Sequence, residues 1–247
     1  KTFKKNMGNP LISVIIPNYN KGQFLFNCIN SVLSQTFENF EIIIVDNFSN
    51  DNSLQILESF SDPRINLIMF RNHGIIAASR NIGIKNSEGK YLAFLDSDDY
   101  WTPNKLDEAY SILDEGADIV YHDFFRYTLR SSKTNKIIKS RVFKKNITQD
   151  LIINGNPIIN SSVVVNKDLF IINKCFSEDI DLVTAEDADA WIRFSQITDK
   201  FFYLPKALGY LYEGEFNTSN SNIKKIISSQ KLIIIYSEQI YKSSSKP

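Results

Sequence analysis

The feature that most constrains the fold is a regular alternation, over the first hundred residues, of short β-branched runs with segments of helical hydrophobic spacing. Strand-like runs occupy 11–16, 40–45, 65–70 and 91–95, and another follows at 118–121. Between them, apolar residues recur every three or four positions. Alternating strands and helices are typical of a parallel sheet with crossover helices. The pattern therefore predicts an α/β fold with a mostly parallel central sheet flanked by helices.

Polar residues follow three of these runs, at the point where each predicted strand ends. Pro17-Asn18-Tyr19-Asn20 closes the first run, Asp46 ends the second, and Asp96-Ser97-Asp98-Asp99 follows the fourth. In an open parallel sheet, ligands bind beyond the carboxyl ends of the strands. We therefore expect these three segments to converge on one crevice.

Composition excludes several classes of protein. The 28 Lys and Arg balance 28 Asp and Glu, so the chain lacks the basic excess with which proteins cover nucleic acid, and we expect no nucleic-acid partner. Its apolar stretches, such as 232–236, are far shorter than the roughly 20 residues of a spanning helix. The two cysteines, Cys28 and Cys175, give no disulfide framework or zinc site.

The acidic segment 96–99 allows two interpretations. Three carboxylates directly after an apolar strand repel one another unless a cation or strong donors lie among them. Mg²⁺ or Mn²⁺ takes one or two carboxylates and completes its shell with diphosphate oxygens, which favours a metal site. Alternatively, the acids cap the helix that begins near Pro103 and Lys105. The residues alone leave both interpretations open, and the predicted place at the sheet edge favours the metal.

Five motifs in a fixed order carry a family resemblance. ISVIIPNYNKG, FEIIIVDNFSND, RNHGIIAASRNIG, GKYLAFLDSDDYW and AEDADAWIR resemble those of the inverting GT-A glycosyltransferases of family 2, of the bacterial surface-polysaccharide type, over roughly residues 10–215. The resemblance implies a GT-A domain over 1–222, with a Rossmann-like nucleotide-sugar half at about 10–122 and an acceptor half at about 123–222. It also implies a hexosyl- or N-acetylhexosaminyltransferase that moves a sugar from a nucleotide sugar, of the UDP class, to a saccharide or lipid-linked acceptor.

The same resemblance assigns roles at the nucleotide. Pro17, Tyr19 and Asn20 would line the base and ribose pocket, and Asp46 would accept the N3 hydrogen of uracil. The resemblance also implies that Asp96 lies on the ribose side, and that Asp98, with Asp96, binds Mn²⁺ or Mg²⁺. A further pair, Arg80 and Asn81, would lie at the nucleotide.

Glu186-Asp187 resembles the family's Glu-Asp motif, in which a carboxylate deprotonates the acceptor hydroxyl. An inverting transfer needs one such base on the face away from the leaving diphosphate. We favour Asp187 over Glu186, while the alternative is that both acids cap the helix over 188–195. Two departures from the family stand out: Asn47-Phe48 replaces an acid and a glycine, and the stretch 210–214 has no His.

Two alternative functions remain. A nucleotidyltransferase has a similar sheet and metal acids, but its Gly-rich, Lys-bearing loop after the first strand is missing here. A non-catalytic carbohydrate-binding module is disfavoured by the retained Asp98 and Glu186-Asp187.

Two segments lie outside the regular pattern. The basic run 126–145 is expected to be irregular or hairpin-like, and 223–247 to form an amphipathic helix with a frayed tail. Packing of this helix on the catalytic domain is the ordinary outcome, and peripheral contact with a membrane is the alternative. We accordingly expect a cytoplasmic location, free or peripheral at the inner face of the membrane.

Overall fold

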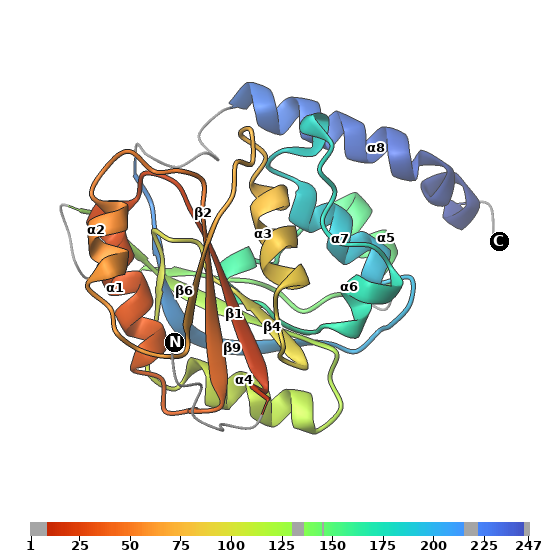
Figure 1. The fold of residues 1–247 in the computed structure, drawn as a ribbon. Helices are drawn as coiled ribbons and strands as arrows, with labels where there is room; N and C mark the ends of the chain where they lie inside the picture. Colours follow the sequence, from red (N-terminus) through yellow and green to blue (C-terminus); the bar gives the residue numbers. More distant parts are fainter. Residues whose placement is uncertain (1–8, 130–135, 145, 215–221, 245–247) are drawn as a thin grey trace.

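The computed structural model describes residues 9–129, 136–144, 146–214 and 222–244 and is built around one mixed sheet (Figure 1). Its strand order is β3-β2-β1-β4-β8-β6-β9-β5, with β7 paired to β6. The strands are β1 (Ile12–Asn18), β2 (Phe40–Asp46), β3 (Ile65–Met69), β4 (Tyr91–Phe94), β5 (Tyr100–Trp101), β6 (Ile119–Tyr127), β7 (Ile137–Ile138), β8 (Val164–Asn166) and β9 (Phe201–Tyr212). The helices are α1 (Gly22–Leu33), α2 (Ser53–Glu58), α3 (Ile76–Lys85), α4 (Lys105–Asp114), α5 (Ile147–Asn154), α6 (Asp168–Ile172), α7 (Glu186–Phe194) and α8 (Asn222–Ser244), with short 3₁₀ turns η1 (Asn160–Ser162) and η2 (Ile180–Leu182).

The first half of the sheet is parallel and confirms the predicted α/β fold. β1 pairs in parallel with both β2 and β4, and β2 pairs in parallel with β3. The register aligns Asn18 with Asp46, the last residues of β1 and β2. Parallel pairing therefore brings the ends of these strands to one edge, as the sequence predicts.

Beyond β4 the sheet becomes mixed. β8 is antiparallel to β4 and β6, whereas β9 is parallel to β6. The predicted hairpin-like segment is found as β6 and β7, which pair in antiparallel fashion. Within this basic run, residues 130–135 and 145 lie outside the described part of the chain. The parallel prediction thus holds for the first four strands, and the second half follows a different topology.

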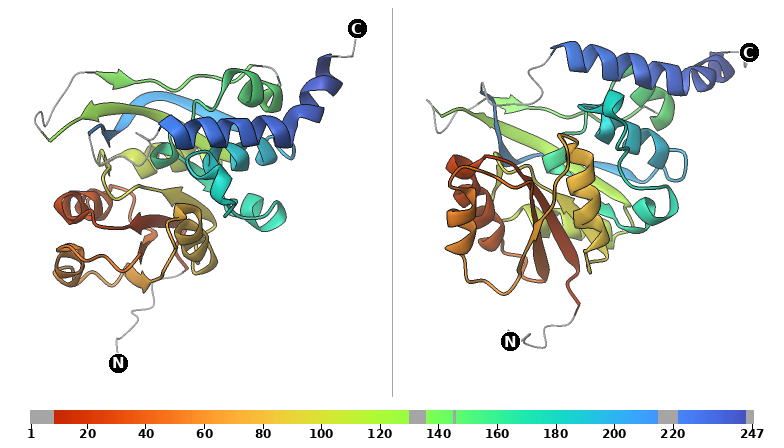
Figure 2. Two further views of the ribbon diagram at one scale, coloured as in Figure 1. Left: turned by 90° about the horizontal axis from the view of Figure 1, so that it is seen from above. Right: turned by 45° about the horizontal axis from the view of Figure 1, so that its top comes forward.

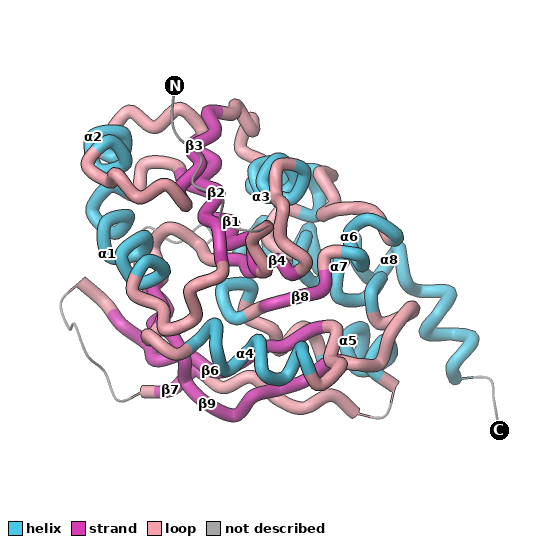
Figure 3. The backbone as a smooth tube through the Cα atoms, turned by 60° about the horizontal axis from the view of Figure 1, so that its bottom comes forward, coloured by secondary structure: helices cyan, strands magenta, loops and turns pink. Residues whose placement is uncertain are grey.

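Two apolar cores cover the two faces of the sheet (Figure 2). Alternate residues of β1 divide between them: Ile12, Val14 and Ile16 face one core, and Ile15 faces the other. This division follows from the strand period of two. Helices α1, α2 and α4 contribute to the first core, and α3, α5, α6 and α7 contribute to the second. Figure 3 shows α4 against the end of the sheet formed by β6, β8 and β9.

The C-terminal helix packs on the domain. α8, predicted from residue 223, lies across the outside of α5 and η2 (Figures 1 and 2). Tyr236 is buried in the second core, and Leu232 packs against it. Among the described residues, no helix combines the length and apolar character needed to cross a membrane. The tail residues 245–247, expected to fray, lie outside the described part of the chain.

Candidate active site

The acidic loop after β4 contains one carboxylate that fixes its shape. Asp99 is buried, and its two oxygens accept hydrogen bonds from the Ser161 hydroxyl at 2.6 Å and from the Tyr212 backbone N–H at 2.9 Å. Burial, followed by the charges of Asp98 and Asp96, raises the pKa of Asp99 well above its usual range. Asp99 therefore joins the loop to η1 and β9, a structural role that the sequence analysis missed.

The other two carboxylates of this loop are more exposed, and each has a cationic partner. Asp98 forms an ion pair with Lys21 Nζ at 2.6 Å, just before α1. Asp96 forms one with Arg80 at 2.8 Å. Burial raises the pKa of Asp98, and the charge of Lys21 opposes that rise. Two side-chain cations thus neutralise the pair of acids predicted to bind the metal.

Arg80 links this loop to the predicted base motif. Its guanidinium is 3% exposed; one terminal nitrogen donates to Asp96 and the other to Glu186, at 2.7 Å. These carboxylates raise the pKa of Arg80 despite the opposing effect of burial. The sequence predicted Arg80 at the nucleotide, whereas the structure shows both its terminal nitrogens engaged within the protein.

Glu186 and Asp187 have different environments at the start of α7. Glu186 accepts from Arg80 through one oxygen and from the Thr184 N–H through the other, at 2.9 Å. Asp187 accepts from the Ala188 N–H at 2.7 Å and only a long bond, 3.3 Å, from Asn156. Burial, followed by the charge of Glu186, raises the pKa of Asp187 to about 7. Of the two acids, Asp187 is therefore the one with an oxygen that accepts only a long hydrogen bond, and its raised pKa allows it to exchange a proton near neutral pH.

The residue before this motif has an unusual backbone. Thr184 has φ of 86°, in the left-handed region that β-branched residues rarely adopt. Its N–H reaches Glu186, and its hydroxyl lies 3.1 Å from that of Ser228 on α8. The surrounding contacts must therefore hold this conformation.

The predicted nucleotide residues lie together at the ends of β1 and β2. Tyr19 is 52% exposed, Asn20 is also exposed with φ of 51°, and Pro17 is buried within β1 beside Val45. Asn20 accepts from the Asn50 N–H at 2.8 Å, which holds this turn against the one that follows β2.

Asp46 is placed differently from the prediction. It is fully buried, and its oxygens accept from Asn18 Nδ2, the Ser49 N–H and the Ser49 hydroxyl, all at 2.7 Å. In this structure Asp46 holds the turn, and no surface is open for a base to contact. Nearby, the Phe48 side chain is exposed, and the central carbon of the Arg71 guanidinium lies 4.3 Å from the centre of its ring. A contact between Asp46 and uracil stays a prediction that would require these bonds to open.

The Asn81 side chain forms hydrogen bonds within the protein. Its amide nitrogen donates to the Phe176 carbonyl at 2.9 Å and to Glu178 at 2.8 Å, and its amide oxygen accepts from the Phe176 N–H. Arg80, the preceding residue of α3, points in a different direction from Asn81 because successive positions of a helix lie about 100° apart. Asn81 therefore anchors the segment before η2, and its contact with a nucleotide stays a prediction.

The stretch after the last strand also uses its polar groups internally. Where the family has a His, Glu213 forms an ion pair with Arg126, and the neighbouring Tyr127 hydroxyl donates to the Asp98 carbonyl. His122 is buried in β6 and bonded to the Asp123 carbonyl, as expected for a structural side chain. His73 is exposed with φ of 52°.

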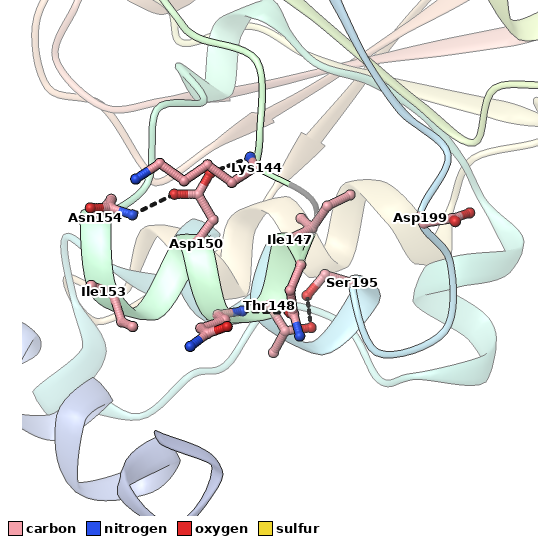
Figure 4. Close-up of a pocket in the computed structure, with 10 residues that line it drawn as sticks. Lys144, Ile147, Thr148, Asp150, Ile153, Asn154, Ser195 and Asp199 are labelled. Carbon is pink, nitrogen blue, oxygen red and sulfur yellow. Dashed lines mark hydrogen bonds between the residues drawn. The ribbon is translucent and has the colours of Figure 1, made fainter. Parts of the chain in front are cut away.

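A cavity of about 910 Å³ lies away from these acids (Figure 4). It is lined mainly by α5 and includes Ser195 and Asp199. The Asp150 carboxylate accepts from the Lys144 N–H and from Asn154 at its edge, each at 2.7 Å, as drawn in Figure 4. None of the predicted site residues lines this cavity, so it is separate from the acidic cluster.

The carboxylates of the acidic loop fit the needs of a divalent cation at a diphosphate. Among the described residues, no group of three or more His, Cys, Asp or Glu side chains forms a metal cage. Mg²⁺ and Mn²⁺ need only one or two carboxylates when a diphosphate supplies other oxygens. Asp98, with Asp96, offers this donor set, and burial of Asp98 favours a bound cation over a bare charge. The residues fit such an ion if Lys21 moves away from Asp98.

Comparison with known sequences gives consistent matches. A sequence model described as Glycosyl transferase family 2 matches residues 13–171. Glycosyltransferase GlyG of Streptococcus pneumoniae serotype 4 is 38% identical over 120 residues, which are 47% of this chain and 40% of GlyG. The uncharacterized glycosyltransferase RP339 of Rickettsia prowazekii is 30% identical over 207 residues, 81% of this chain and 63% of that protein. The UDP-Glc:alpha-D-GlcNAc-diphosphoundecaprenol beta-1,3-glucosyltransferase WfgD of Escherichia coli is 39% identical over 107 residues, 43% of this chain and 42% of WfgD.

Solved structures share the fold. TarS 1-349 of S. aureus, in complex with UDP-GlcNAc, matches with a TM-score of 0.69 and 25% identity over 85% of this chain and 61% of TarS. The mannosyltransferase PcManGT from Pyrobaculum calidifontis, in complex with GDP-Man and Mn²⁺, matches with a TM-score of 0.63 and 15% identity over 95% of this chain and 65% of that one. The chain thus spans less than two thirds of the length of each of these proteins.

Proposed function

Because this chain belongs to glycosyl transferase family 2 and has the GT-A fold, we propose that it transfers a sugar from a UDP-sugar to a hydroxyl of a saccharide or lipid-linked saccharide, with inversion. The observation that carries the proposal is the Arg80 bridge, which brings the acids of the 96–99 loop within one side chain of the Glu186-Asp187 pair. A relative named for a UDP-glucose donor, and a neighbour bound to UDP-GlcNAc, support the donor class.

The proposed reaction is a single displacement. The oxygen of the acceptor hydroxyl forms a bond to the anomeric carbon while the bond from that carbon to the diphosphate oxygen breaks. The electron pair of the broken bond leaves with the nucleoside diphosphate. The proton of the hydroxyl passes to the Asp187 carboxylate, whose pKa of about 7 allows it to accept a proton at neutral pH. Glu186, held by Arg80 and Thr184, keeps the loop in shape.

We further propose that Asp98, with Asp96, holds Mn²⁺ or Mg²⁺ at the diphosphate. Such an ion, when bound, stabilises the negative charge that grows on the leaving diphosphate. The donor set of two carboxylates supports this assignment, and a neighbour of the same fold is bound to Mn²⁺. Tyr19, exposed at the end of β1, is proposed to face the base.

The experiment measures UDP release from UDP-glucose and UDP-N-acetylglucosamine in the presence of Mn²⁺, with water in place of the acceptor. Donor binding is followed separately, by the rise in melting temperature. Asp187→Asn should bind donor within a few-fold of the parent protein, and its rate should fall by about 10² to 10⁴. Asp98→Asn should remove the dependence of UDP binding on Mn²⁺.

The matched control is Asp168→Asn, because Asp168 is exposed at the start of α6 and far from the motif in sequence. It should release UDP at the parent rate. If Asp187→Asn hydrolyses donor normally while Glu186→Gln does not, Glu186 is the base instead. If no donor in a full panel of nucleotide sugars binds or is hydrolysed, the chain is a non-catalytic module.

We also propose that α8 contacts an anionic membrane surface from outside. Over residues 222–237 it has three lysines and no acidic residue, and Glu238 follows. The side of α8 opposite Ser228 and Tyr236 carries exposed isoleucines: Ile223, Ile226, Ile227, Ile233 and Ile234. A basic helix with an apolar face binds such surfaces. Co-sedimentation with vesicles of phosphatidylglycerol should be lost in Ile226→Ser/Ile234→Ser. Equal sedimentation of parent and variant, or a parent that dimerises instead, would contradict the proposal.

A further inference from the structure

We propose that α8 positions the loop that carries the base, so that Ser228, Lys231 and Tyr236 act on the reaction through Asp187 without touching substrate. The base loop is defined here as residues 176–187. This inference rests on the proposed function and adds to it three residues outside all five sequence motifs.

Three residues of α8 contact the base loop and the first turn of α7. The Ser228 hydroxyl is 3.1 Å from that of Thr184, and Lys231 Nζ is 3.1 Å from Asp179 and 3.4 Å from Asp181. Further along α8, the Tyr236 hydroxyl donates to Asp189 at 2.7 Å. Because these contacts begin eight residues before Asp187 and end two residues after it, they bracket the proposed base.

Two of the contacts are well shielded from solvent. Ser228 is 2% exposed and Tyr236 is 4% exposed. A buried hydroxyl that loses its partner costs roughly 1 to 3 kcal/mol. Asp189, the partner of Tyr236, is also paired with Arg193 at 2.9 Å and so has a fixed direction. These contacts therefore restrict α8 and α7 to one relative arrangement.

The base loop needs such support because its own structure supplies little. The only regular element within 176–185 is η2, which has three residues, and α7 begins without a side-chain cap at Ala185. Thr184 has the strained φ of 86°. Asn81 holds the start of the loop at Phe176 and Glu178. The contacts from α8 hold the part of the loop that leads to Asp187. Removing the α8 contacts lets Thr184 relax, and Asp187 then moves with it.

The test uses the full chain and compares Ser228→Ala, Lys231→Met and Tyr236→Phe with Gln230→Ala, a control on the exposed side of α8. We expect the rate of UDP release from the donor to fall by about 5- to 100-fold, because a displacement near 1 Å costs up to 10²-fold. UDP affinity with Mn²⁺ should stay within about twofold, since a base contributes little to donor binding. The acid limb of the pH profile should also shift, because the surroundings of Asp187 change.

Lys231→Arg keeps the charge and should restore most of the rate lost in Lys231→Met. Asp187→Asn is measured in parallel. If Asp187→Asn loses activity and the three α8 variants match Gln230→Ala, positioning by α8 is wrong and the proposed function stands. If Asp187→Asn is fully active, Asp187 is not the base and its positioning by α8 has no object; if Glu186→Gln is fully active as well, the proposed function itself fails. If the α8 variants lose UDP affinity and melting temperature together with the rate, α8 supports the whole fold, and the positioning role is overturned.

Discussion

At the scale of single residues, the most informative finding is that the protein neutralises its own acidic loop. Lys21 pairs with Asp98 and Arg80 pairs with Asp96, so both carboxylates proposed to bind a metal already have a cation nearby. Lys21 directly follows the Asn20 turn, immediately precedes α1 and reaches Asp98 of the acidic loop. If the proposed metal and diphosphate bind here, we expect Lys21 to exchange Asp98 for a diphosphate oxygen, because a flexible ammonium group is easily redirected.

The first prediction tests this exchange with Lys21→Met. Removing the ammonium frees Asp98, so Mn²⁺ should bind more tightly in the absence of nucleotide, by about 3- to 10-fold, equivalent to roughly 1 kcal/mol for a partly exposed pair. UDP, which would lose a cation, should bind more weakly. Isothermal titration with Mn²⁺ alone and then with UDP measures both effects. Lys85→Met, at the exposed end of α3, is the control. Unchanged Mn²⁺ affinity would show that Lys21 does not compete with the metal.

At the scale of elements, the sequence predicted the parallel strands and their ends but not the contacts made by side chains. Runs of β-branched residues and the polar residues that end them are local signals, and they correctly placed Asn18 beside Asp46. Asn81 shows the limit, because its partners lie 95 residues or more away, and no local pattern encodes them. The sequence also could not distinguish Asp99 from Asp96 and Asp98, because only its burial in the folded protein shows its structural role.

The mixed half was harder to predict for a topological reason. β9 follows the irregular stretch after α7, yet it pairs in parallel with β6 and shifts register between His122 and Phe125. Its sequence, with Pro205 and Lys206 in the middle, breaks the alternation expected of a strand. The docking of α8 was expected from its apolar stripe, whereas its polar contacts with the base loop depend on tertiary structure alone.

The second prediction concerns two adjacent elements, β6 and α4, which bury His122 and Lys105. Neither His122 Nε2 nor Lys105 Nζ has a hydrogen-bond partner among the described residues. Burial and the nearby Lys105 lower the pKa of His122 to about 3, and burial lowers the pKa of Lys105 well below its usual range. Between pH 6.5 and 3 the unfolded chain therefore binds a proton at His122 that the folded chain does not. Stability attributable to His122 is lost as the pH falls through this window.

The measurement is urea unfolding at pH 7 and pH 5. The His122 contribution to the free energy of unfolding should fall by about 2 kcal/mol between these values, and His122→Gln should lose that part of the pH dependence. His73→Gln, at an exposed position, should keep the parent slope. The rise in the pKa of Asp187 acts in the opposite direction but is common to all three proteins. A His122→Gln slope equal to that of the parent would contradict a neutral, buried His122.

At the scale of the whole molecule, one side chain joins the two halves of the domain. Arg80 belongs to α3, which packs on the parallel strands, whereas Glu186 begins α7, 106 residues later. Its other carboxylate partner, Asp96, lies in the loop that follows β4. The positive charge of Arg80 lies between acids from both halves, so the geometry of the 96–99 loop and of the Glu186-Asp187 pair is set together.

The third prediction is that Arg80→Met destabilises the fold, because Glu186 remains buried without a counter-ion and Asp96 loses its partner. Removing one member of a buried ion pair costs about 3 to 5 kcal/mol. Arg80→Met/Glu186→Gln removes the stranded charge and should recover part of that loss, a coupling that a double-mutant cycle in urea measures. Arg64→Met is the control, because Arg64 pairs with Asp62 only two residues away at 2.8 Å, and such a local, partly exposed pair contributes about 0 to 1 kcal/mol. Two outcomes would contradict this prediction: Arg80→Met could lower the free energy of unfolding by no more than Arg64→Met, or the double variant could be no more stable than Arg80→Met. Either would mean that the halves are held together by the sheet and its two cores alone.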